Sequence, residues 1–425
     1  MSLAFSQLGS RQVESDIARL MTMAIERPEL LSLAAGFTDN DTLPLEEVTK
    51  VAVELGEEGN RSVLQYGANQ GRLELRQQIV SRLERQDGRM PGAYSAENCL
   101  VTNGSQQSLY LAVQTLCDPG DVVLVEQPTY FVFLEMLRGL GVEAVPMPMG
   151  SDGDVDVEGL RQQLAGFADK GELARVKAVY LVSYFANPSG HSVSSDCKDA
   201  IVSLLAEHGG SIAIFEDAAY RELYYKQPFE AESCIQKANA EQVPLLYTST
   251  LTKPFASGLK VGYAICTHRD WLNRMLAVKG QQDFGTVNYA QAILCRVFEK
   301  GLFDQRLETL RQSYHEKMLC LHQTLLQGLG PHGWAWEEPR GGLYIWVNAP
   351  SGIETDFDSV FHAHATQAGV MYVPGDLCDA NRKRSNKIRL SFGVLQKADL
   401  EEAARRFIRA AEATQRALKS KTYIN

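Results

Sequence analysis

The middle of the chain alternates between short apolar runs and stretches in which apolar residues recur every three or four positions. The runs at 121–128, 176–185 and 211–219 are apolar for most of their length, which is typical of strands buried on both faces of a sheet. The stretches between them, such as 131–141 and 194–209, have the spacing of amphipathic helices. Because strands that alternate with helices build parallel sheets, the pattern predicts an α/β fold with a mainly parallel sheet flanked by helices.

The C-terminal part has a different pattern. A long helical pattern at 291–329 is followed by two short predicted strands, at 342–349 and 387–394, and by a last helix at 399–418. This mixture favours a smaller α+β domain packed beside the sheet domain. We therefore expect three parts: an N-terminal segment that joins the small domain, a large sheet domain and a small C-terminal domain, at 1–45, 46–290 and 291–425.

Composition and charge narrow the class of protein. The chain has 425 residues and a formal net charge of -10, which argues against general nucleic-acid binding, since that needs a basic face. It lacks a continuous apolar run of membrane-spanning length, so we expect no membrane partner. The eight cysteines form no CxxC pair, which favours free thiols and a cytoplasmic location. His362 and His364 lie two positions apart, a spacing that on a helix would point them to different faces, so we expect no metal site.

Ligands of doubly wound sheets bind at the carboxyl ends of the strands, so the residues that follow the strands are the candidates for chemistry. Ser105 and Gln106 follow the first predicted strand and begin a helix, whose free N–H groups suit a phosphate, although Ser105 is equally suited to be a plain N-cap. Thr250, Thr252 and Lys253 follow a later strand, and Lys260 lies seven residues further on. Hydroxyls together with a cation can bind phosphate.

Three other strand ends carry an aromatic ring, an amide and an acid. Tyr130 suits the face of an aromatic ligand or an ordinary core position, and Asn187 lies in a turn sequence. Asp217, with Tyr220 close behind it, ends a strongly apolar strand, where a carboxylate needs a partner or serves as a helix cap. Together these residues place phosphate binders, an acid, an aromatic face, an amide and a lysine at one edge of the sheet.

In this order, the residues resemble those of class I/II aminotransferases of pyridoxal-phosphate (PLP) fold type I. The subgroup that includes the kynurenine and α-aminoadipate aminotransferases is the most similar. The likeness extends from about Leu31 to Arg406. It rests on an ordered set of motifs: Tyr66, GSQQ at 104–107, PTY at 128–130, NPSG at 187–190, DAAY at 217–220, TLTK at 250–253 and RLSF at 389–392.

The resemblance implies a role for each residue around the PLP ring. Lys253 would hold the cofactor as a Schiff base and, once displaced by the substrate amine, would act as the base that moves the proton. Asp217 would pair with the ring nitrogen and keep it protonated. Asn187 and Tyr220 would hydrogen-bond the ring 3′-oxygen, and Tyr130 would stack on the ring.

The resemblance also implies phosphate and substrate contacts. The phosphate would be held by Ser105, Gln106, Thr250, Thr252 and Lys260, and by Tyr66 of a neighbouring subunit, which makes a homodimer part of the expectation. Arg389 would clamp the substrate α-carboxylate, with Asn187 beside it, and Gly36 would leave room for the substrate. Arg19 is a candidate for sensing the substrate side chain; the alternative is a charged residue on an amphipathic helix.

Lys260 departs from the family pattern, which usually has arginine there. It keeps the charge but loses the fork geometry, so we expect weaker retention of the cofactor. Ala186 and the stretch 37–44 also differ from the usual residues, which leaves the substrate open.

The expected activity is transfer of an amino group between an L-amino acid and a 2-oxo acid by a ping-pong mechanism. Other reactions on the same scaffold, such as those of racemases, β-lyases and decarboxylases, remain alternatives, because the protein selects which bond the cofactor breaks. Arg389 favours cleavage of the Cα–H bond, hence transamination or racemisation. A transcription regulator with an aminotransferase-like sensor domain is disfavoured, because only about 30 residues precede the similar region.

Overall fold

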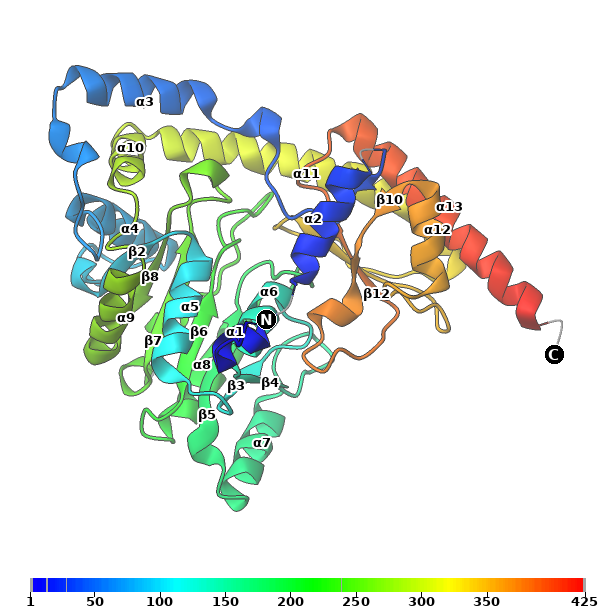
Figure 1. Cartoon of the computed structure of the whole chain (residues 1–425), viewed down its shortest axis with the longest axis horizontal. Coiled ribbons are helices and arrows are strands. Elements are labelled where there is room, and N and C mark those ends of the chain that lie inside the picture. Colours follow the sequence, from blue (N-terminus) through cyan, green and yellow to red (C-terminus); the bar gives the residue numbers. More distant parts are fainter. Residues whose placement is uncertain (1–2, 13, 28, 238, 423–425) are drawn as a thin grey trace.

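The computed structural model describes residues 3–12, 14–27, 29–237 and 239–422, and its centre is a seven-stranded sheet (Figure 1). The strand order is β2-β8-β7-β6-β5-β3-β4. All neighbouring strands run parallel except at β8, which is antiparallel to both β2 and β7. The prediction of a mainly parallel sheet flanked by helices is therefore confirmed. The strands are β2 (Cys99–Thr102), β3 (Val122–Val125), β4 (Glu143–Pro146), β5 (Val176–Val182), β6 (Ala213–Asp217), β7 (Leu245–Thr250) and β8 (Gly262–Cys266).

Both faces of this sheet are covered, which explains why its strands are almost continuously apolar. Successive side chains of a strand point to opposite faces. In β3, Val123 packs with residues of α5, α6 and α9, whereas Val122 and Leu124 pack with residues of α7 and α8. The helices of this part are α3 (Leu45–Glu57), α4 (Leu73–Gln86), α5 (Ser105–Leu116), α6 (Phe131–Leu140), α7 (Val157–Asp169), α8 (Ser195–Ala206) and α9 (Arg269–Gln282).

The C-terminal part lies beside the sheet, on the right in Figure 1. It contains a three-stranded antiparallel sheet in the order β11-β12-β9. Strand β1 of the N-terminal segment pairs with β10 of this part, with Leu31 opposite Val370. The remaining elements are α1 (Gln7–Arg11), α2 (Asp16–Glu26), β1 (Leu31–Ser32), α10 (Asn288–Glu299), α11 (Leu302–Leu329), β9 (Tyr344–Asn348), α12 (Val360–Ala368), β10 (Val370–Met371), β11 (Val373–Pro374), β12 (Lys387–Ser391) and α13 (Lys397–Thr422).

The structure adds detail that the pattern did not predict. The long helical region at 291–329 is two helices, because Gly301 adopts a left-handed φ of 68° between α10 and α11. Helices α9 and α12 were not predicted. The domain boundaries at residues 45 and 290 stay predictions. Within the described ranges, no helix is long and apolar enough to cross a membrane.

Candidate active site

Lys253 lies just after β7, in the connection to the antiparallel strand β8, and is half-buried. Its Nζ donates a hydrogen bond to the carbonyl of Gly36. Burial, together with the nearby cations Arg389 and Lys260, lowers the pKa of Lys253 to about 8. Among the ion pairs of the described residues, none involves this amine. Lys253 is therefore a half-buried amine that reaches its neutral, nucleophilic form near physiological pH.

Asp217 is the last residue of β6 and is 4% exposed. Its carboxylate accepts hydrogen bonds of 3.0 Å from the backbone N–H of Ala219 and of 3.0 Å from the hydroxyl of Tyr180. Burial raises the pKa of Asp217 to about 6, since no cationic side chain in the described part of the chain pairs with it. A buried acid without a cation suits a ligand that brings a positively charged N–H. Tyr180 was missed because it lies within a strand that the pattern assigns to the core.

Arg389 on β12 is 2% exposed and also lacks a charged partner. Its Nη1 donates to Oδ1 of Asn187 at 2.9 Å and its Nη2 to the carbonyl of Ala34 at 2.6 Å, while the buried Nε has no partner among the described residues. Its Cζ lies 4.3 Å from the ring centroid of Tyr344. A buried guanidinium that makes only neutral contacts is suited to receive a carboxylate.

Two tyrosines and a glycine lie between these charged groups. The hydroxyls of Tyr220 and Tyr344 are 3.0 Å apart. A Cβ at Gly36 would lie 2.7 Å from the Tyr344 hydroxyl, so that tyrosine occupies the space a larger side chain would need. Tyr344 was not predicted, because it begins an apolar strand and no motif marks it.

The N-terminus of α5 forms a potential anion site. Ser105 is the first residue of the helix, after Gly104 with a φ of 74°. A Cβ at Gly262 would lie 2.4 Å from the carbonyl carbon of Gly104, so only glycine lets β8 approach the helix end this closely. The hydroxyls of Thr250 and Thr252 are 2.7 Å apart in the adjacent turn. Exposed N–H groups and hydroxyls in this arrangement suit a phosphate.

Lys260 supplies a cation to the same region. Its charge contributes to the lowered pKa of Lys253, after burial and Arg389. Its backbone is left-handed, with a φ of 58°. Gln106, in the first turn of α5, is exposed. The N-terminus of α5, Thr250, Thr252 and Lys260 together form a phosphate cradle. This cradle has the hydrogen-bond donors and the positive charge that a phosphate requires.

The predicted aromatic residues differ in their surroundings. Tyr130 immediately precedes α6, and burial, together with charges that include those of Asp217 and Arg389, shifts the pKa of Tyr130 upward overall. Tyr130 therefore lies close to Asp217 and Arg389 of the candidate site. Tyr66 is 80% exposed, and its ring packs edge-on against Phe284 at a centroid distance of 5.9 Å. Within one chain Tyr66 thus remains on the surface.

Arg19 lies on α2, the helix that Figure 1 shows between the sheet and the C-terminal part. Its guanidinium packs over the ring of Phe357, 4.4 Å from the centroid. The first residue of the helix, Asp16, pairs with Arg382 of the C-terminal part. The structure thus connects α2 to the C-terminal part, and Arg19 makes an aromatic contact there.

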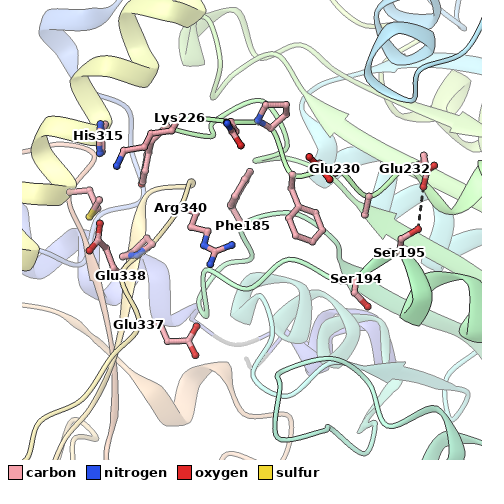
Figure 2. A pocket seen from close by; sticks show the side chains of 17 residues that line it. Phe185, Ser194, Ser195, Lys226, Glu230, Glu232, His315, Glu337, Glu338 and Arg340 are labelled. Atoms are coloured by element: carbon pink, nitrogen blue, oxygen red, sulfur yellow. Dashed lines mark hydrogen bonds between the residues drawn. The ribbon is translucent and has the colours of Figure 1, made fainter.

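A cavity of about 1360 Å³ lies apart from these residues, between α11 and the loops at 225–232 and 337–340. Figure 2 shows Arg340 and Phe185 in its middle, with Glu337 below them and Glu230 on the opposite side from Lys226. None of the predicted site residues lines it. This cavity is therefore separate from the residues that the chemistry requires.

The residues fit PLP and a substrate carboxylate. The ring needs an acid at its nitrogen, the aldehyde needs an amine, the phosphate needs N–H groups and hydroxyls, and the substrate carboxylate needs a cation. Asp217, Lys253, the N-terminus of α5 with Thr250 and Thr252, and Arg389 supply these four groups. Asp217, Lys253 and Arg389 have no oppositely charged partner among the described residues.

Comparison with known proteins agrees with this arrangement. The family model for aminotransferase class I and II matches residues 28–407. Aromatic-amino-acid aminotransferase 1 of Thermococcus litoralis is 28% identical over 404 residues, which cover 95% of this chain and 92% of the relative. The structure of Pyrococcus horikoshii kynurenine aminotransferase has a TM-score of 0.86 at 27% identity. The superposition covers 96% of this chain and 97% of the kynurenine aminotransferase chain. That of Thermus thermophilus α-aminoadipate aminotransferase, complexed with N-(5'-phosphopyridoxyl)-L-leucine, has a TM-score of 0.83 at 27% identity, with the same shares covered.

Proposed function

The chain belongs to the class I and II aminotransferase family, and from this premise we propose a role for each residue of its site. It is a PLP-dependent transaminase that moves an amino group between an amino acid and a 2-oxo acid. The observation that carries the assignment of roles is a set of three groups without oppositely charged partners among the described residues: the half-buried amine of Lys253, the buried acid Asp217 and the buried guanidinium of Arg389.

Bound PLP supplies an aldehyde that condenses with amines and a ring that withdraws electrons from the substrate Cα. With PLP bound, Lys253 would anchor the cofactor through Nζ, and the same Nζ, once free and neutral, would take the proton from the substrate Cα and deliver it to C4′ of the cofactor. Asp217 accepts a hydrogen bond from the protonated ring nitrogen. Asn187 and Tyr220 donate to the ring 3′-oxygen, and Tyr130 covers the ring.

The other residues bind and orient. Ser105, Gln106, Thr250, Thr252 and Lys260 hold the phosphate. Arg389 donates both arms of its fork to the substrate α-carboxylate, which fixes the Cα–H bond relative to Lys253. Gly36 lies beside the substrate, and Arg19 is the candidate for contact with the substrate side chain.

We also propose a homodimer in which Tyr66 reaches the phosphate of the neighbouring subunit. Four exposed apolar residues support it: Leu64, Tyr66, Phe284 and Val287, each at least 60% exposed. Their segments lie together, since the side-chain amide of Asn288 donates to backbone carbonyls at 62 and 65. An exposed apolar patch of this kind marks an interface. A cytoplasmic location is supported by the eight cysteines, which are all free thiols.

A panel of amino acids tests the assignment. The cofactor-loaded protein is mixed with aromatic amino acids, 2-aminoadipate and kynurenine, the classes for which its relatives are named. The cofactor absorbance should convert stoichiometrically to that of the aminated cofactor, with release of one 2-oxo acid. Racemisation or loss of carbon dioxide without release of an oxo acid would instead assign one of the other reactions of this scaffold.

The lowered pKa of Lys253 predicts how the apoenzyme takes up PLP. Only the neutral amine reacts, so the loading rate should rise with pH and level off above about pH 8, the pKa of Lys253. With an unperturbed lysine, the loading rate would keep rising until about pH 10.4. Stopped-flow loading between pH 6 and pH 11 measures this, with a free lysine derivative as the control. A rate that still climbs beyond pH 10 would show that the amine is not perturbed.

Lys260→Arg is expected to slow the loss of the cofactor by about fivefold, because the guanidinium fork forms two bonds to a phosphate where an ammonium forms a point contact. The left-handed backbone at this position is equally accessible to both residues. Dialysis against a PLP scavenger measures the loss. The control is Lys226→Arg, an exposed lysine on the separate cavity, which should change nothing. Equal rates in wild type and K260R contradict the expectation.

A further inference from the structure

Tyr344 connects residues that the proposed function uses, although no motif marks it. It is the first residue of β9 and is 2% exposed. Its hydroxyl lies 3.0 Å from that of Tyr220, and the two rings meet edge to face at a centroid distance of 5.7 Å. A buried hydroxyl needs a hydrogen-bond partner, and Tyr220 is the partner that the described structure provides.

The sheet positions this ring under Arg389. β9 and β12 are antiparallel, with Arg389 opposite Trp346, so the side chain of Tyr344, two residues before Trp346, points to the same face as Arg389. The guanidinium accordingly lies 4.3 Å from the centroid of the tyrosine ring. The ring of Tyr344 thus contacts Arg389, whereas its hydroxyl bonds to Tyr220.

The hydroxyl also touches the backbone that receives Lys253. The Cβ that Gly36 lacks would lie 2.7 Å from the Tyr344 oxygen, and the Gly36 carbonyl accepts the bond from Lys253 Nζ. Glycine at position 36 therefore leaves the space that the Tyr344 hydroxyl occupies beside Tyr220.

The direction of the bond between the two hydroxyls decides what Tyr220 can do. A hydroxyl donates one hydrogen bond and accepts others. If Tyr344 donates, the proton of Tyr220 is free for another acceptor, and a chain of such bonds polarises and strengthens the last donor. Burial, with the neighbouring Tyr344, raises the pKa of Tyr220, so Tyr220 keeps the proton that it has to donate.

We propose that Tyr344 is a positioning residue whose hydroxyl donates to Tyr220 and thereby directs the Tyr220 proton toward the 3′-oxygen of bound PLP. The inference rests on the role assigned to Tyr220 in the proposed function. It adds a residue that acts through Tyr220 and not on the cofactor itself.

The consequence is spectroscopic. The negative charge on the 3′-oxygen stabilises the proton on the nitrogen that joins Lys253 to the cofactor, and a donor to this oxygen weakens that effect. Loss of the Tyr344 hydroxyl should therefore raise the pH midpoint of the cofactor absorbance change, by about half a unit for one neutral hydrogen bond. Tyr344→Phe keeps the ring under Arg389, so KM for the amino donor should stay within about twofold.

The experiment compares the absorbance titrations of four cofactor-loaded proteins: wild type, Y344F, Y220F and the double variant. Both single variants should raise the midpoint, and Y344F should add nothing in the Y220F background, because the hydroxyl acts through Tyr220. Tyr94→Phe is the control, since it also loses a tyrosine hydroxyl bond, of 2.6 Å to Asp87, whose other hydrogen-bond partners, Arg221 and Ser233, have no role in the proposed site. It should leave the midpoint unchanged.

Each other outcome is decisive. An unshifted Y344F midpoint beside a shifted Y220F midpoint overturns the inference and leaves the proposed function intact. An equal shift from Y344F in both backgrounds shows action independent of Tyr220 and also overturns the inference. An unshifted Y220F midpoint removes the assigned role of Tyr220 and the inference with it. Circular dichroism and melting temperature confirm that each variant is folded.

Discussion

Lys253→Ala is expected to lower the rate of amino transfer by about 10⁴-fold or more, while the protein still binds PLP. The loss is large because one amine both anchors the cofactor and moves the substrate proton, and proton transfer by a positioned group alone contributes about 10²–10⁴-fold. Cofactor binding persists because the phosphate cradle at α5 and the acid Asp217 do not depend on the lysine. Single-turnover conversion of a loaded donor measures the rate.

Rescue by a small amine separates this loss from misfolding. A primary amine added at high concentration can replace the missing base, so activity of K253A should rise with the concentration of the neutral amine. A variant that retains more than about a tenth of wild-type activity would assign the proton transfer to another group.

Arg389→Lys should lower kcat/KM for amino acids by about 100-fold. Lysine keeps the positive charge but loses one arm of a bidentate contact with the α-carboxylate, and a hydrogen bond to a charged group contributes about 1.5–3 kcal/mol. The change also removes the bond to Asn187, which in wild type is 2.9 Å long. Steady-state kinetics with a series of donor concentrations measures the loss.

The control for R389K is a donor without an α-carboxylate. Wild type and variant should react with such an amine at equal, low rates, because the contact that distinguishes them is absent. A variant that loses the same factor with both kinds of donor would show that Arg389 supports the fold of the site and does not bind the carboxylate.

The sheet and much of the site were predictable because their signals are local. A continuous run of apolar residues predicts a strand buried on both faces. Asp217, at the end of such a strand, is a charged residue at a position that is expected to be buried. Lys253 stands out because it follows two threonines at such a strand end. The carboxyl ends of parallel strands meet at one edge, so these residues were expected together without any knowledge of distances.

The rest could not be predicted because it depends on contacts between distant segments. Arg389 binds Asn187 across 202 positions of sequence, and Lys253 reaches the Gly36 carbonyl across 217. Tyr180 and Tyr344 lie within apolar strands. At such positions the sequence does not distinguish a tyrosine that only packs in the core from one whose hydroxyl also bonds to a residue of the site. Helix α9 was missed although Trp271, Leu272 and Met275 have helical spacing, because charged and amide residues surround them.

The most direct test of the central claim is to reduce the PLP-loaded protein with borohydride, digest it and locate the cofactor by mass spectrometry. We expect one phosphopyridoxyl group per chain, on the peptide that contains Lys253 and on the Nζ of that residue. A group found on Lys260 or another lysine, or no retained cofactor mass after reduction, would contradict the account.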